Sequence, residues 1–311
     1  MRSVLVTGAT GFLGRYIVEA AISRGYRVCA LARCSSEWLS QVSVRSGLGP
    51  LQQLNLADTF AGERFEACFH LASSSDVSAS VADPYADLEN SVLPTGALFA
   101  YLAKHQPGCR VLLASSAAVY GNPARLPINE SAPCAPISPY GVHKCLVENL
   151  AGQYARLFDL PVVSMRIFSA YGVGLRKQLL WDAVRKGIDA LRSKSGEVVF
   201  FGTGLESRDF IHATDVAESF LCVAERAPLE PFAVVNVACG VEVQVRDVVG
   251  GVLSSISPCL KAKFGSRARS GDPARWLADI AKLRSYGFCP RIDLRASVPE
   301  YVMWASGQAK E

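Results

Sequence analysis

The stretch VLVTGATGFLG, residues 4–14, decides the fold expected of this chain. Its β-favouring start predicts a strand, and the apolar spacing from Phe12 onward predicts a helix directly after a glycine turn. Gly8 lets the chain reverse, Gly11 lets a pyrophosphate approach the backbone, and Gly14 lets the helix pack closely against the strand. Unpaired N–H groups and the positive end of the helix dipole favour a phosphate at this point. The stretch therefore predicts a dinucleotide site lined by Gly8, Gly11, Phe12, Leu13 and Gly14.

Length and composition set the outer limits of what the protein can be. The 311 residues are enough for one large α/β domain with a smaller domain appended. A net charge of +4 is too small for a nucleic-acid-binding protein, although it suits an anionic small molecule. Because no run of about eighteen apolar residues occurs, no membrane span is expected. The first strand begins so early that it leaves no room for a signal peptide, and a cytoplasmic protein is expected.

The ten cysteines are scattered, and none forms a C-x-x-C pair. Several of them lie within strand-like runs. We therefore expect buried, reduced thiols that act as small apolar side chains, and neither a disulfide framework nor a metal site.

The end of the expected second strand, residues 27–31, bears on the choice of cofactor. The adenosine ribose of a dinucleotide lies at this point of such folds, where an acidic residue would accept hydrogen bonds from the ribose hydroxyls of NAD. Here Ala32 and Arg33 follow the strand, with Ser35 and Ser36 behind them. The missing carboxylate favours a 2′-phosphate, and hence NADP, held by Arg33, Ser35 and Ser36. The alternative is that Arg33 is a solvated surface residue.

Further strands are expected over residues 50–54 and 66–72, and a helix over 85–104. Pro94 lies inside that helical pattern and predicts a kink or a late start. His70 is expected to be a hydrogen-bonded core residue. The end of the strand over 66–72 should line the cofactor with Leu71, Ala72 and Ser73. Together these elements predict an α/β fold with a doubly wound, Rossmann-like parallel sheet.

A strand over residues 110–116 ends at Ser116, on the carboxyl edge where such sheets bind ligands. After a proline-rich loop, Ser138 and the proline that follows it predict a helix start. Tyr140 and Lys144 are then four residues apart on one helix face. A free tyrosine has a pKa near ~10, and a lysine ammonium one turn away is expected to lower it. Ser116, Tyr140 and Lys144 are the candidate catalytic residues, and the last two also face the cofactor.

The glycine pattern, the strand-end serine and the Tyr-x-x-x-Lys spacing together resemble the extended short-chain dehydrogenases/reductases of the nucleotide-sugar epimerase/dehydratase/reductase group. Further segments resemble the same group over residues 161–172, 208–216, 236–240 and 269–273. The resemblance spans essentially the whole chain. It implies a dinucleotide-binding domain over residues 1–170, with a return of the chain at 208–240, and a smaller C-terminal nucleotide-sugar domain over 171–311.

The resemblance also implies roles for residues whose function no local sequence pattern indicates. Arg208 and Arg269 would hold the diphosphate of the substrate, and Lys177 would reach it as well. Ser169 stands at a substrate-binding position where relatives usually carry asparagine. In relatives an Asp-Leu pair contacts adenine, and Asn55 and Leu56 occupy those two positions here. Relatives dimerise through the helices that correspond to residues 85–104 and 140–157, so a homodimer is expected.

Chemistry at C4 of a nucleotide-activated sugar is common to the activities that the resemblance implies, with a place in polysaccharide biosynthesis. A 4,6-dehydratase is disfavoured, because relatives with that activity place Asp-Glu after the strand-end residue. Ala117 and Ala118 stand there and cannot transfer protons. The expected ribose site favours an NADPH-dependent 4-keto-(6-deoxy)sugar-nucleotide reductase. The alternative is a 4-epimerase with tightly bound NAD, and a non-catalytic cofactor sensor of the same fold is a remote third.

Overall fold

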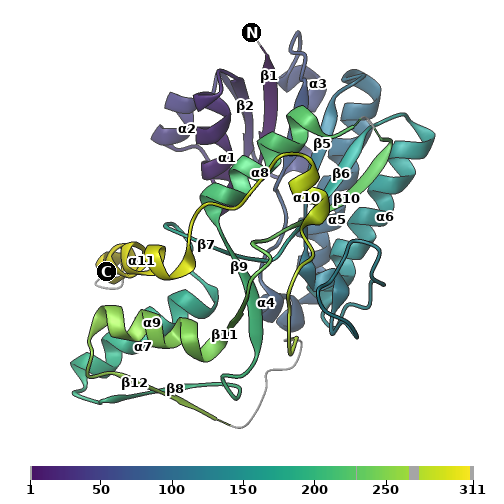
Figure 1. Cartoon of the computed structure of the whole chain (residues 1–311). Helices are drawn as coiled ribbons and strands as arrows, with labels where there is room; N and C mark the ends of the chain where they lie inside the picture. The colour runs from purple at the N-terminus through teal and green to yellow at the C-terminus, as the bar shows by residue number, and fades with distance from the viewer. Residues whose placement is uncertain (1, 229, 266–272, 309–311) are drawn as a thin grey trace.

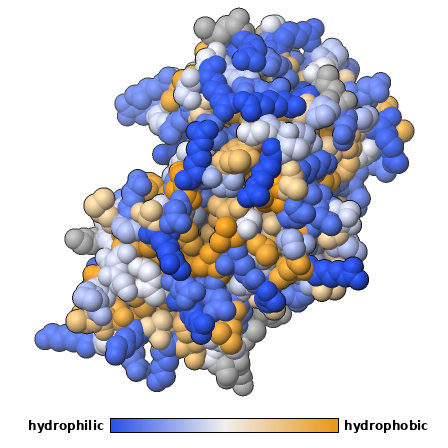
Figure 2. All heavy atoms as spheres, viewed as in Figure 1, coloured by the Kyte–Doolittle hydropathy of each residue, from blue (hydrophilic) through white to orange (hydrophobic). Residues whose placement is uncertain are grey.

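The computed structural model describes residues 2–228, 230–265 and 273–308. The chain forms a larger α/β lobe and a smaller lobe built mostly from its C-terminal half (Figure 1). Figure 2 shows hydrophobic side chains gathered in the hollow between the two lobes, with hydrophilic ones around it.

The larger lobe is built on a parallel sheet of seven strands in the order β10-β6-β5-β4-β1-β2-β3. Its strands are β1 (Ser3–Thr7), β2 (Arg27–Ala32), β3 (Arg45–Leu48), β4 (Ala67–His70), β5 (Arg110–Ser116), β6 (Val162–Ile167) and β10 (Phe232–Val237). The strand order reverses between β1 and β4, and ligands of open α/β sheets bind at the carboxyl ends of the strands at such a point. The predicted doubly wound sheet is confirmed.

Helices cover both faces of this sheet. On one face α1 (Phe12–Ser23) packs against α8 (Ala213–Arg226), and on the other α5 (Pro84–His105) packs against α6 (Pro139–Leu157). Side chains alternate between the two faces of a strand, so Val4 and Val6 of β1 enter one hydrophobic core and Leu5 enters the other. Shorter helices are α2 (Glu37–Val42), α3 (Leu56–Thr59), α4 (Val77–Ala82) and α10 (Ala281–Ser285).

The smaller lobe has a hydrophobic core of its own. It contains α7 (Gln178–Arg192), α9 (Val245–Ile256) and α11 (Leu294–Gln308), with the paired strands β8 (Glu197–Phe200) and β12 (Lys261–Phe264). A three-stranded sheet, in which β9 (Ser207–His212) lies between β7 (Ser169–Tyr171) and β11 (Glu242–Gln244), runs between the two lobes (Figure 1).

One local prediction is wrong, and one of the two alternatives for the Pro94 helix is excluded. Residues 50–54 do not form a strand, because Gly49 has a φ of +126° and Pro50 cannot donate to a ladder. A 3-10 helix, Leu51–Gln53, occupies that segment, and the third strand lies earlier, at β3. The late start considered for α5 does not occur either: the helix begins at Pro84 and continues through Pro94.

Apolar side chains on α5 and α6 remain at the surface, among them Leu93, Val142 and Leu146. They lie on the helices through which a homodimer is expected, and the dimer stays a prediction. All ten cysteines are free thiols, but only Cys29, Cys68, Cys109 and Cys222 are buried, so the expectation of buried thiols is wrong for the other six. Over the described ranges, no helix is long and apolar enough to cross a bilayer, and no three metal-ligating side chains cluster.

Candidate active site

The glycine turn after β1 forms a cradle with no room for side chains. Gly8 has a φ of +67°, and a Cβ atom on it would lie 2.9 Å from the Ala72 nitrogen. A Cβ atom on Gly14 would lie 2.1 Å from the Gly8 carbonyl oxygen. Gly11 is the N-cap of α1 and has no side chain to accept the first helical N–H groups. The turn therefore has the close-packed backbone and the uncapped helix start on which the predicted diphosphate site depends.

A buried hydrogen-bonded chain beneath this turn was not predicted. The Thr7 hydroxyl accepts from the Leu71 and Ala72 N–H groups at 3.1 and 3.0 Å and lies 2.7 Å from His70 Nδ1. His70 Nε2 lies 2.9 Å from the Thr95 hydroxyl. Burial, with the Lys144 charge nearby, lowers the pKa of His70 to about 3. His70 is therefore the hydrogen-bonded core residue that the sequence predicts, is neutral, and joins the ends of the paired strands β1 and β4.

Ser116, Tyr140 and Lys144 come together at the carboxyl edge of the sheet. Ser116 ends β5, and α6 begins where the Ser138 hydroxyl accepts from the Gly141 N–H at 3.2 Å. Tyr140 is half-buried, and its hydroxyl is close enough to Ser116 for an interaction that lowers the pKa of the phenol. Lys144 is buried, and its Nζ lies 5.7 Å from the centroid of the Tyr140 ring.

The ammonium of Lys144 is hydrogen-bonded to groups at the carboxyl ends of β4 and β5. Its Nζ donates to Ser73 Oγ at 3.0 Å and to the Ala114 carbonyl at 2.8 Å. Ser73 in turn donates to Ser91 Oγ of α5 at 3.0 Å. Burial lowers the pKa of Lys144 to about 8, although the charge of Asp87 opposes this.

The effect expected of Lys144 on Tyr140 is not found. Burial raises the pKa of Tyr140 to about 12, while the hydrogen bond with Ser116 lowers it. Burial therefore outweighs any stabilisation of the phenolate by Lys144, and the phenol keeps its proton at neutral pH in the protein alone. The sequence predicts that the lysine ammonium lowers the pKa of Tyr140, whereas in the protein alone burial raises it.

The residues expected along the adenosine half lie in the segment after β2 and at the start of α3. Arg33 and Ser35 are exposed after β2, and the Ser36 hydroxyl caps α2 by accepting from the Leu39 N–H at 3.1 Å. Asn55 caps α3 through Asp58, and Leu56 packs into the core. Leu71, Ala72 and Ser73 directly follow β4, next to the glycine turn.

Three of the substrate residues implied by the resemblance, Ser169, Lys177 and Arg208, lie on β7, at the start of α7 and on β9. Arg208 of β9 donates to the Ser207 carbonyl at 2.8 Å and stacks over Trp276, 5.5 Å from its ring centroid. Ser169 begins β7 and pairs with β9. Lys177 donates to the Ser75 carbonyl at 2.8 Å and to Ser75 Oγ at 2.5 Å, and so joins the start of α7 to the loop after β4. Arg269 lies outside the described residues.

Two carboxylates in the segment after Arg208 have structural roles. Asp209 accepts from the N–H groups of Cys239 and Gly240, both at 2.9 Å, and of Ala278 at 3.2 Å. Asp215 accepts from the N–H groups at residues 291 and 292. Segment 208–216 therefore connects β9 and α8, through these hydrogen bonds, to backbone near residues 239–240, 278 and 291–292.

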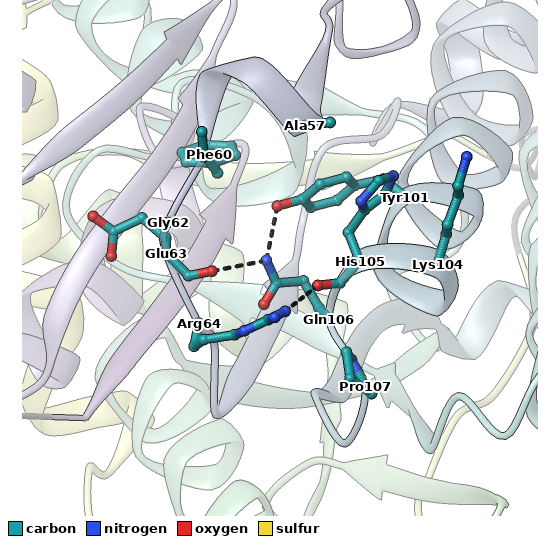
Figure 3. A pocket seen from close by; sticks show the side chains of 11 residues that line it. Ala57, Phe60, Gly62, Glu63, Arg64, Tyr101, Lys104, His105, Gln106 and Pro107 are labelled. Atoms are coloured by element: carbon teal, nitrogen blue, oxygen red, sulfur yellow. Dashed lines mark hydrogen bonds between the residues drawn. The ribbon is translucent and has the colours of Figure 1, made fainter.

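A separate hollow lies at the opposite edge of the sheet (Figure 3). It is formed by residues 57–64 and 101–107, which precede β4 and β5 and therefore lie at the amino ends of those strands. Its polar groups bond to one another: Gln106 donates to Tyr101 Oη and the Glu63 carbonyl, and Arg64 donates to the His105 carbonyl (Figure 3). The catalytic candidates are at the other end of the sheet.

Comparisons with known proteins identify the family and the fold. The structure of MoeE5 in complex with UDP-glucuronic acid and NAD is 31% identical, with a TM-score of 0.85 over 98% of this chain and 99% of that one. A UDP-N-acetylglucosamine 4-epimerase structure from Methanobrevibacter ruminantium is 26% identical, with a TM-score of 0.84 and 99% of both chains covered. A putative UDP-glucose 4-epimerase of Methanocaldococcus jannaschii is 27% identical over 97% of each chain. Residues 4–238 match the NAD dependent epimerase/dehydratase family, and the chain belongs to that family.

Proposed function

We propose that this protein is an NAD-dependent 4-epimerase of a UDP-sugar. The observation that carries the proposal is the convergence of Ser116, Tyr140 and Lys144 beside the glycine cradle, in a chain whose relatives are named as 4-epimerases. The larger lobe would hold the dinucleotide and the smaller lobe the UDP-sugar. MoeE5 has been seen with UDP-glucose and with UDP-glucuronic acid, so a UDP-hexose or UDP-hexuronic acid is the proposed substrate class.

The residues of the site supply proton transfer and positioning. Ser116 would hydrogen-bond the 4-oxygen of the sugar, and Tyr140 would take the proton from that oxygen and later return it. Bound NAD would accept the C4 hydride and give it back to either face, and its oxidised ring carries a positive charge. Lys144, fixed by Ser73 and Ala114, holds a second positive charge beside the phenol. Positive charges near a buried tyrosine favour its phenolate, which a proton acceptor needs.

The relatives support the epimerase. Residues 32–36, at the expected ribose site, favour the NADPH-dependent reductase instead. An epimerase removes and restores the same hydride, so its cofactor need not leave. A reductase must exchange its cofactor at every turnover. The exposed position of Arg33 is compatible with either cofactor, because an exposed arginine can turn into solvent.

The purified protein is expected to carry NAD and to need none added. UDP-glucose or UDP-glucuronic acid should be converted to its C4 epimer without added nicotinamide, as followed by chromatography of the UDP-sugars. The cofactor released by denaturation should be NAD. Arg33→Ala should leave this activity within about twofold, because no 2′-phosphate is bound. Recovery of NADP, or turnover only of 4-keto substrates with NADPH consumption, would replace the epimerase with the reductase.

Arg208→Ala is expected to weaken UDP binding and to spare NAD. Loss of charge-assisted hydrogen bonds to a diphosphate costs about 1.5–3 kcal/mol, or about 10- to 150-fold in Kd. Calorimetric titration with UDP measures the change, and Arg192→Ala, an exposed arginine of α7, is the control that should bind UDP normally. Equal UDP affinity in the Arg208 variant and the wild type would place the diphosphate elsewhere.

A further inference from the structure

Two thiols meet beside the candidate active site. Cys134 lies in the loop between Ser116 and Tyr140, and Cys145 directly follows Lys144 in α6. Each side chain is placed to hydrogen-bond the other, and this interaction shifts the pKa values of the two thiols in opposite directions. Cys134 is exposed, whereas Cys145 is half-buried against the core. A solvent-accessible thiol with a second thiol in contact is the arrangement of a redox pair.

The surroundings of the two thiols differ. Arg166 Nη2 lies 3.3 Å from Cys134 Sγ and is held in place because Arg166 also donates to Glu148 at 2.7 and 3.0 Å. The hydrogen bond from Cys145 and then the Arg166 charge lower the pKa of Cys134 to about 7, against burial and the charge of Glu148. The same hydrogen bond, with burial, raises the pKa of Cys145. Cys134 is thus the thiolate of the pair, and Cys145 stays a thiol.

We propose that Cys134 and Cys145 are a site of reversible oxidation, at which a hydroperoxide closes a disulfide. The Cys134 thiolate attacks the terminal oxygen of the hydroperoxide and the O–O bond breaks, which leaves a sulfenic acid on Cys134. The departing alkoxide, or hydroxide when hydrogen peroxide is the oxidant, takes a proton from solvent and leaves as an alcohol or as water. The Cys145 sulfur then attacks the Cys134 sulfur, the S–O bond breaks, and water leaves with the Cys145 proton. The two thiols together give two electrons to the peroxide.

The bond would join two parts of the site. It would link the loop that precedes Tyr140 to the helix position directly after Lys144, with the sulfurs about 2.05 Å apart. The Arg166 guanidinium would lose its thiolate partner and keep Glu148. No part of this step involves the dinucleotide or the sugar, so the oxidation is independent of the proposed epimerase activity.

Peptide mapping of the full chain tests the proposal. The reduced protein is treated with hydrogen peroxide at pH 7, free thiols are blocked with N-ethylmaleimide, and an unreduced digest is analysed by mass spectrometry. We expect a peptide pair joined through Cys134 and Cys145, which dithiothreitol separates. Cys134 should be oxidised about tenfold faster than the exposed Cys289, because the thiolate is the reacting form.

Three variants assign the roles. Cys145→Ser should leave Cys134 as a sulfenic acid that dimedone labels, and Cys134→Ser should show neither the label nor the joined peptides. Cys289→Ser is the matched control and should form the disulfide as the wild type does. Wild-type protein in which Cys134 is oxidised without becoming joined to Cys145 would overturn the proposal. Equal oxidation rates at Cys134 and Cys289 would overturn it as well.

Discussion

Turnover of the UDP-sugar should fall by about 10²–10⁴-fold when Tyr140 is replaced by phenylalanine, because that is the usual contribution of a positioned acid–base group. Phenylalanine keeps the ring in its half-buried place and removes only the hydroxyl that bonds to Ser116. NAD should remain bound, since its cradle lies in the glycine turn after β1. The measurement is the rate of epimer formation on protein of known NAD content.

Tyr85→Phe is the matched control for this variant. Tyr85 is exposed at the start of α5, and loss of its hydroxyl should leave the rate unchanged. A Tyr140→Phe protein with more than about half of the wild-type rate would show that another group moves the proton. Loss of NAD together with activity would point to a folding or binding defect instead.

Gly14→Ala should destabilise the protein and abolish its retention of NAD. The added Cβ atom would lie 2.1 Å from the Gly8 oxygen and 2.9 Å from the Ala9 Cα, and both are backbone atoms that cannot turn aside. Overpacking of this kind costs about 1–3 kcal/mol, and a clash with backbone belongs at the upper end. The free energy of unfolding in urea and the NAD content of the purified variant report the two effects.

The same substitution at Gly250 should act in the opposite direction. Gly250 lies inside α9, and a Cβ atom there meets nothing within 4 Å. Alanine in an open helical position is favoured over glycine by about 0.5–1 kcal/mol. Similar unfolding free energies for Gly14→Ala and Gly250→Ala would mean that the glycine turn is not tightly packed, and the cradle would lose its physical basis.

The sequence predicted correctly those features that are set by residues close to one another along the chain. The strand, turn and helix over residues 4–23 follow from apolar spacing and glycine placement, and the start of α6 follows from Ser138 and the proline after it. The face shared by Tyr140 and Lys144 follows from the helical repeat alone. Once the order of strands and helices is known, parallel pairing brings the ends of β1, β4 and β5 to one edge. The doubly wound sheet was therefore determined by the sequence.

Only the tertiary structure decided what the site residues touch. Lys144 is held by Ser73, 71 positions away, and Lys177 reaches Ser75 across 102 positions. The pKa of Tyr140 rises because surrounding segments bury it, and no spacing in the sequence reports burial of that kind. Cys134 and Cys145 come together because the loop after β5 folds back onto α6. Spacing determines local geometry, whereas burial and long-range contact depend on how the whole chain packs, and these set the charge and reactivity of the site.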